Sequence, residues 1–260
     1  MEGMLNRSAS LRAPTSVREE PLNEAHAEGG RRVLPADLRR KIAAIEASGG
    51  KGAGRCLSTG VTALDASLPG RGLALAAVHE IQGSSAAGFA LHLLASGLSN
   101  EECILWCVPE GRRDHLYGPG LWQAGIDPRR LVVAVCRDRE EMLWTVEEAL
   151  KSGSVAAVVA QMDKDRSWGG PVSGKPVDLT ASRRLQLAAE AGGGLGIILS
   201  EGGGALSPSA AATRWCVDPA PLSDTRDRAC WQIALLRVRG GAVPDKDWRV
   251  RVDRDGRVSI

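Results

Sequence analysis

Apolar runs that alternate with helix-period segments are the feature that most constrains the fold of this 260-residue chain. From residue 73 onward, runs with the composition of β-strands are separated by segments that repeat apolar residues every three to four positions. Because strands joined by helices pair in parallel and are covered on both faces, the pattern predicts an α/β fold with a mostly parallel twisted sheet. The expected strands are 73–82, 103–108, 131–136, 155–160, 195–199, 213–217, 230–238 and 247–252, and the expected helices are 87–98, 114–123, 138–151 and 179–191.

The last two expected strands differ from the others, because Trp248, Val250 and Val252 alternate with charged residues. A strand of this kind has one buried and one wet face, which is typical of antiparallel pairing. The sequence therefore predicts an antiparallel C-terminal edge. The excess of basic residues from Arg237 onward suits either protection of an open edge or an edge that contacts a partner or DNA, and both interpretations stay open.

The N-terminal segment has a different character from the rest of the chain. Residues 1–32 are polar and mixed in charge, and we predict a disordered tail. Residues 33–54 are predicted to form a helix, with Leu38, Ile42 and Ile45 on one stripe, followed by a glycine-rich linker. This helix either packs on its own domain or docks on a neighbouring molecule as an oligomerisation helix.

Composition limits which cellular compartment and which ligands are expected. No apolar run approaches the roughly 20 residues that a membrane helix needs, and the N-terminus has no apolar signal segment, so we expect a cytoplasmic protein without a membrane partner. The six cysteines follow neither a disulfide framework nor the spacing of a metal site, which predicts reduced thiols and no metal. The net charge of +2 gives no global basic field of the type that predicts nucleic-acid binding.

The most informative motif follows the first expected strand, where Gly83 and Gly88 have the spacing of a phosphate-binding loop. Such a loop ends in Lys and then Ser or Thr, which neutralise phosphate charge and bind Mg²⁺. Phe89 and Ala90 stand at those two positions and can do neither. Backbone N–H groups could still hold a small anion, but the sequence predicts a degenerate P-loop without a nucleotide cofactor.

The second nucleotide-binding element is also changed. In P-loop enzymes an acidic residue at the end of a strand helps to hold Mg²⁺, whereas Ala160 and Gln161 occupy that place here. Asp163 lies two residues past the expected strand, and we expect it to point elsewhere. No nucleophile motif supports a Ser-His-Asp site either. The sequence therefore predicts that the chain is not an enzyme.

The order of motifs resembles the core of RecA-type proteins. The run LSTGVTALD at 57–65 and the run PGRGL at 69–73 precede His79–Gly83, and Glu110 stands where RecA-type enzymes keep a catalytic glutamate. More specifically, residues 55–260 resemble the ImuA family, RecA-like inducible mutagenesis proteins of bacteria. The other runs that carry this resemblance are LYGPGL at 116–121, LWTVEEALKSG at 143–153, DLTASRRLQLAAEAGG at 178–193 and ALSPSAAATRW at 205–215.

The resemblance implies a RecA-like domain with a degenerate P-loop over 55–260 and a non-catalytic accessory role in damage-induced (SOS) mutagenesis. The implied partners are an ImuB-like Y-family polymerase homologue and an error-prone DNA polymerase III alpha subunit, with RecA and a second copy of the chain as further candidates. Two alternatives stay open: a RecA-like DNA-dependent ATPase or recombination modulator, and a SulA-like cell-division inhibitor.

If the fold is RecA-like, two loops at the carboxyl ends of strands are candidate DNA surfaces. In the first loop, 161–178, the residues that could contact phosphates or stack on a base are Lys164, Arg166, Trp168 and Lys175. Aspartates in the same loop cancel this charge, so a solvated loop is the favoured interpretation and DNA contact stays undecided. The second loop, 200–207, is short and glycine-rich, and we expect weaker DNA binding there.

Overall fold

The computed structural model describes residues 54–162, 177–200, 208–222, 227–254 and 256–260, which all belong to one compact unit of the chain. Several predictions fall on other residues and lie outside this description. They concern the N-terminal tail, most of the linker, the helix residues Leu38, Ile42 and Ile45, the carboxylate of Asp163, and the candidate DNA contacts Lys164, Arg166, Trp168 and Lys175.

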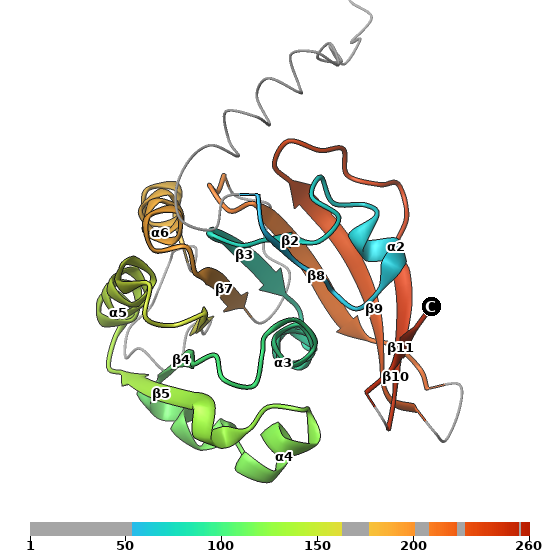
Figure 1. Ribbon diagram of the computed structural model, residues 1–260, viewed down its shortest axis with the longest axis horizontal. Coiled ribbons are helices and arrows are strands. Elements are labelled where there is room, and N and C mark those ends of the chain that lie inside the picture. Colours follow the sequence, from blue (N-terminus) through green and yellow to red (C-terminus); the bar gives the residue numbers. More distant parts are fainter. Residues whose placement is uncertain (1–53, 163–176, 201–207, 223–226, 255) are drawn as a thin grey trace, which may run out of the picture. The chain divides into compact units, whose positions relative to one another are not determined.

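The described residues form a nine-stranded mixed sheet (Figure 1). Its parallel strands are β3 (Ala77–Gln82), β4 (Ile104–Pro109), β5 (Leu131–Cys136), β6 (Ala157–Met162), β7 (Leu195–Ser200) and β8 (Thr213–Pro219). Its antiparallel strands are β9 (Asp227–Val238), β10 (Trp248–Asp253) and β11 (Val258–Ser259). The order is β11-β10-β9-β8-β3-β7-β6-β4-β5. The predicted mostly parallel sheet and its antiparallel C-terminal edge are therefore confirmed.

The first expected strand, 73–82, is interrupted in the structure. Leu73–Ala74 forms β2, which pairs with β1 (Cys56–Leu57) in a separate two-stranded sheet, whereas β3 belongs to the central sheet. Ala76 between them has a φ of 53°, a left-handed conformation that a continuous strand cannot contain. The short helix α2 (Thr62–Asp65) lies between β1 and β2 in the chain.

The expected helix 114–123 consists of two elements, the 3₁₀ helix η1 (Glu110–His115) and α4 (Gly118–Gln123). The two residues between them have extended backbone, so the helical path is broken there. Pro119 stands in the first turn of α4, where its missing N–H is tolerated. A further 3₁₀ turn, η2 (Pro128–Arg130), leads into β5.

Helices cover both faces of the sheet, as predicted (Figure 1). Helix α3 (Ala86–Gly97) and α4 pack on one face, and α5 (Arg139–Ser152) and α6 (Leu179–Gly192) pack on the other. Strand β7 lies between two apolar cores, because Ile197 belongs to the core beneath α3 and Ile198 to the core beneath α5 and α6. Every helix in the described ranges is too short or too polar to span a bilayer.

Residues at both ends of α5 and α6 explain why these helices begin and end where they do. The carboxylates of Asp138 and Asp178 each accept a hydrogen bond from the backbone N–H three residues later, at 2.8 and 2.7 Å. Gly153 and Gly193 follow the helices with φ values of 62° and 85°, the left-handed conformation of a helix C-cap. The sequence predictions for these two helices are therefore close to the observed bounds.

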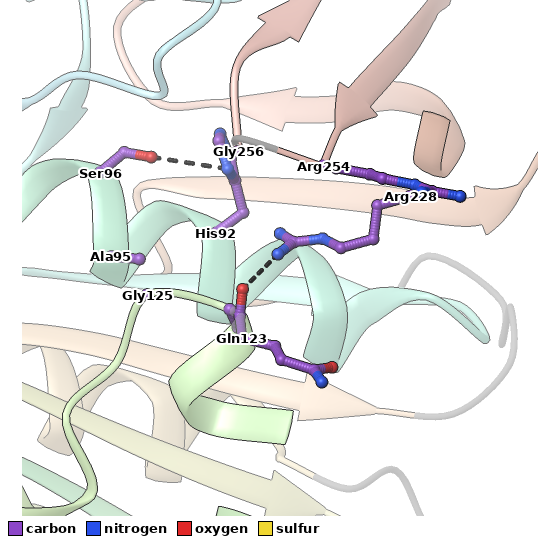
Figure 2. A pocket seen from close by; sticks show the side chains of 9 residues that line it. His92, Ala95, Ser96, Gln123, Gly125, Arg228, Arg254 and Gly256 are labelled. Atoms are coloured by element: carbon purple, nitrogen blue, oxygen red, sulfur yellow. Dashed lines mark hydrogen bonds between the residues drawn. The ribbon is translucent and has the colours of Figure 1, made fainter. Parts of the chain in front are cut away.

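The C-terminal strands follow the predicted alternation. Trp248, Val250 and Val252 of β10 are buried, whereas Arg249 is exposed and Arg251 is half-buried. A pocket of about 230 Å³ lies between α3, the end of α4, the start of β9 and the turn that follows β10 (Figure 2). The sequence did not predict this pocket, since its walls come from four separate segments of the chain.

Candidate functional site

The loop after β3 is the position of the predicted degenerate phosphate loop. Residues 83–85 connect β3 to α3, and the helix begins at Ala86. Gly88, Phe89 and Ala90 therefore lie inside the first turns of α3 rather than in the loop. The loop is shorter than the spacing of its two glycines suggests.

Gly83 is held against the end of β8. Its φ is 112°, and a Cβ atom added to it would lie 2.3 Å from the carbonyl oxygen of Val217 and 3.0 Å from Oδ1 of Asp218. Gly88 has no comparable constraint, because an added Cβ would lie 3.7 Å from a ring carbon of Trp231, an ordinary contact. The first glycine of the motif is thus required by the fold, and the second is not.

The backbone N–H groups of the loop bind oxygen atoms of the protein itself. The N–H of Gly83 donates to the carbonyl of Ser200, and the N–H of Ser85 donates to the carbonyl of Val217, both at 3.1 Å. The N–H of Ser84 donates to Oδ1 of Asp218 at 3.1 Å, and the Ser84 hydroxyl donates to the same oxygen. In a phosphate loop, backbone N–H groups of the strand–helix connection and of the helix N-terminus bind the anion.

The carboxylate of Asp218 binds the loop directly, since its Oδ1 accepts from both the N–H and the hydroxyl of Ser84. The hydrogen bond from the Ser84 backbone is the main cause that lowers the pKa of the Asp218 carboxyl, so the group stays ionised near pH 7. A phosphate brought to the loop would meet this negative charge and would find the Ser84 N–H already occupied. The thiol of Cys216 points to the second oxygen of the same carboxylate, at 3.4 Å.

Phe89, at the position of the phosphate-loop lysine, is part of the hydrophobic core. The ring is fully buried and lies 6.2 Å from Trp215 of β8 and 5.7 Å from Trp231 of β9, measured between ring centroids. Ala90 is fully buried in the same core. Sequence reasoning identified the missing lysine but not this aromatic cluster, because both tryptophans are distant in the sequence.

Strand β6 contains the residues that the sequence analysis assigned to a second, degenerate nucleotide element. It continues to Met162, beyond the expected end at residue 160, so Ala160 and Gln161 lie inside the strand. Strand β7 separates β6 from β3, and thus from the loop. Glu110 begins η1 directly after β4 and is exposed. Of these three positions, Glu110 alone offers a carboxylate.

Replacing Gly83 with alanine is expected to destabilise the protein by at least about 2 kcal/mol, because the new methyl group would overlap the carbonyl of Val217 and the backbone would be strained. Gly88→Ala is the matched control and should be neutral or stabilising, since alanine is favoured over glycine in a helix. Urea unfolding of both variants measures the difference. Equal stability of the two variants would show that the loop is not held against β8.

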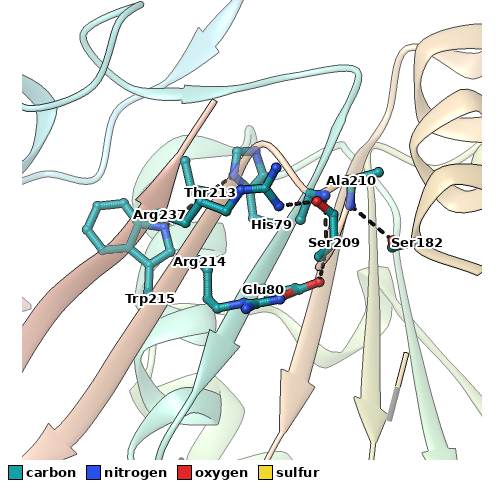
Figure 3. Close-up of polar contacts among 10 residues, drawn as sticks. His79, Glu80, Ser182, Ser209, Ala210, Thr213, Arg214, Trp215 and Arg237 are labelled. Carbon is teal, nitrogen blue, oxygen red and sulfur yellow. Dashed lines mark hydrogen bonds and ion pairs between the residues drawn. The ribbon is translucent and has the colours of Figure 1, made fainter. Parts of the chain in front are cut away.

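A buried ion pair lies on β3 next to the loop (Figure 3). Nε of Arg214 on β8 donates to Oε2 of Glu80 at 2.5 Å, and both side chains are largely buried. The hydroxyl of Ser209 donates to Oε1 of Glu80, and Arg237 of β9 donates to the carbonyl of Ser209. The network therefore connects β3 to β8 and β9, where the sheet changes from parallel to antiparallel pairing.

His79, the preceding residue of β3, belongs to a second buried network (Figure 3). Its Nε2 lies 2.9 Å from the carbonyl of Ala74, which can only accept, so Nε2 carries the proton. Nδ1 then accepts from the Thr213 hydroxyl at 2.7 Å, and that hydroxyl accepts from Nε1 of Trp215. Burial is the main cause that lowers the pKa of His79 to about 4, so the imidazole is neutral at pH 7.

Acidification from pH 7 to pH 5 is expected to lower the free energy of unfolding by about 2 kcal/mol through His79 alone. The unfolded histidine takes up a proton near pH 6.5, whereas the folded one does so only near pH 4, so this stability is lost as the pH falls between these values. Urea unfolding at both pH values measures the effect. In His79→Gln the loss should be smaller, and an unchanged loss would assign the pH dependence to other groups.

Together, the fold and the site define an α/β protein with a strand–loop–helix unit at the phosphate-loop position, in which the loop is closed by the protein's own oxygen atoms. No family model matches the chain. The chain is similar to Protein ImuA from two strains of Caulobacter vibrioides, NA1000 / CB15N and CB 15. Each relative is 34% identical over 209 residues, which cover 71% of this chain and 79% of the relative. The chain therefore belongs to the ImuA family, and the resemblance to this family seen in the sequence is confirmed.

Proposed function

We propose that the protein is a non-catalytic, RecA-like accessory protein of damage-induced (SOS) mutagenesis that acts by binding other proteins. The observation that carries this proposal is the closed loop, whose N–H donors are bound to Ser200, Val217 and Asp218. Membership in the ImuA family supports the mutagenesis role. The partners proposed from the family resemblance are an ImuB-like Y-family polymerase homologue and an error-prone DNA polymerase III alpha subunit.

The edge strand β5 supports a function in protein binding. Val132, Val133 and Val135 are 52%, 42% and 45% exposed, and the strand is the last one of the sheet on this side. Natural proteins usually protect such an edge with charges, proline or a covering segment, because an open apolar edge pairs with other chains. Trp144 on the neighbouring helix α5 is also exposed. An apolar surface of this kind suits contact with another protein.

The two alternative functions differ in whether they require the loop after β3 to bind a nucleotide. A DNA-dependent ATPase would need the loop to release Asp218 and to bind MgATP without the lysine and hydroxyl that normally hold it. A SulA-like division inhibitor, like the accessory protein, needs no nucleotide, and its bound partner would distinguish it. The closed loop favours the two functions without a nucleotide over the ATPase.

Affinity purification of the tagged full chain from DNA-damaged cells tests the proposal. We expect a Y-family polymerase homologue and an error-prone replicative polymerase to be recovered with the wild type, and Val133→Glu to reduce their recovery. Val243→Glu is the matched control, because Val243 is equally exposed but lies between β9 and β10. Recovery of the division protein instead, or MgATP binding by the pure protein, would contradict the proposed function.

A further inference from the structure

Strand β5 is an open edge of the central sheet without the features that usually protect such an edge (Figure 1). Residues 131–136 include no charged residue and no proline, and their register with β4 runs without a bulge along the whole strand. Charges, prolines and bulges are common means of preventing an edge from pairing with another chain. Nothing in these six residues therefore opposes pairing with a further strand.

Exposed valines lie on both faces of this edge. Leu131 packs against the core beneath α3, and Ala134 packs against the core beneath α5 and α6. Because side chains alternate between the two faces of a strand, Val133 and Val135 share the face of Leu131. Val132 shares the face of Ala134, and all three valines are about half exposed. A helix laid on one face would cover only part of this apolar surface, whereas a strand added to the edge would contact it on both faces.

The backbone of β5 offers hydrogen bonds on its outer side. Among the described strands, β5 pairs with β4 alone. A strand with one neighbour directs the N–H and C=O groups of every second residue away from the sheet. An added strand would bind these groups, so recognition at this edge would use the main chain as well as the valines.

The charged residues at the two ends of β5 are already neutralised. Arg129 before the strand binds the carboxylate of Asp127, with Nη2 at 2.7 Å from Oδ2. Arg137 after the strand binds Glu141, with Nε at 3.1 Å from Oε2. Such an edge has little net charge with which to attract a nucleic acid or a charged peptide. It fits a partner strand that is itself apolar and uncharged.

Residues 131–136 themselves meet this description, and two copies of the strand can pair about a two-fold axis. An axis perpendicular to the sheet keeps each face on its own side, so residues that lie opposite each other come from the same face. With Ala134 on the axis, Val133 of each copy lies opposite Val135 of the other. Opposed β-branched side chains stabilise a sheet, and two-fold dimers are the commonest closed assembly of identical chains.

We infer that β5 pairs antiparallel with β5 of a second copy of this chain, which joins the two central sheets into one continuous sheet. The inference rests on the proposed function, because it names the partner that the apolar β5 edge binds directly. The polymerase proteins proposed as partners then bind the dimer, and their recovery depends on the edge because the dimer depends on it.

Light scattering of the purified full chain over a range of concentrations tests the inference. We expect the mass of two chains for the wild type. Val133→Glu and Val135→Glu should each weaken the dimer by about tenfold or more, because each places two like charges in one small apolar interface. Val243→Glu is the matched control and should stay dimeric, since Val243 is also partly exposed but lies between β9 and β10. Thermal unfolding of each variant verifies its fold, and either β5 variant is sufficient if the other does not fold.

The outcome separates this inference from the proposed function. A wild type that is monomeric at the highest soluble concentration overturns the inference, even if Val133→Glu reduces recovery of the polymerase proteins, because the edge then binds those proteins instead. A dimer that both β5 variants retain overturns it as well. A dimer that both variants weaken supports the inference, and it does so even if no polymerase protein is recovered and the proposed function fails.

Discussion

Phe89→Lys combined with Ala90→Thr gives the loop the residues typical of a phosphate loop, yet we expect this change to unfold the protein rather than to create a nucleotide site. Position 89 is fully buried against Trp215 and Trp231, so the lysine would replace an aromatic ring in the core with a charge. The expected loss is about 4 kcal/mol or more, which is a large part of the stability of an ordinary domain. Circular dichroism and urea unfolding measure this loss.

Phe89→Leu is the control for the same position, because it keeps an apolar side chain and should cost about 1–2 kcal/mol. MgATP binding is measured on whichever variants fold. A folded lysine variant that binds MgATP would show that the side chain can leave the core and reach the loop. That result would also revive the ATPase alternative.

Glu80→Ala is the second change with a large expected effect. It removes the carboxylate that pairs with Arg214, and both groups are largely buried. Breaking such a pair from one side typically costs about 3–5 kcal/mol, because the remaining charge loses its partner in a poorly hydrated place. Urea unfolding at pH 7 measures the effect.

Glu148→Ala is the matched control, since Glu148 pairs with Lys151 on the surface of α5, where both side chains are about half exposed. Its effect should be small, as for most surface ion pairs. The double variant Glu80→Ala and Arg214→Ala should be less destabilised than the two single losses added together. Additive effects would mean that the two side chains do not interact.

The sequence predicted most elements of the fold, because buried strands and capped helices have strong local signals. Asp138 and Gly153 show this at the two ends of α5. The two elements that the sequence predicted wrongly are an expected strand and an expected helix that are each divided in the structure. The left-handed conformation of Ala76 divides one expected strand, and the extended residues before Pro119 divide one expected helix. Two-residue strands such as β11 give no periodic signal at all.

The sequence predicted where the candidate site lies, but not that Asp218 is bound to its loop. The spacing of Gly83 and Gly88 located the loop, and Phe89 indicated that the lysine that neutralises phosphate charge was missing. That Asp218 closes the loop depends on the end of β8, which lies far along the chain. The pocket beside α3 is a stronger case, because its walls come from four separate segments of the chain and a β-bulge places Arg228 among them.

The burial of Phe89 limits how the loop can change by mutation. In a nucleotide-binding protein the equivalent of position 89 carries a positively charged lysine. In this chain the side chain at position 89 has to match the volume and shape of the space between two tryptophans. A phosphate-binding loop of the usual kind would require a lysine at 89, a hydroxyl at 90 and removal of the Asp218 carboxylate. The lysine alone would destabilise the core before any ligand could compensate. Folding itself therefore selects against a phosphate-binding residue at position 89, whereas the surface of the protein stays free to be selected for other contacts.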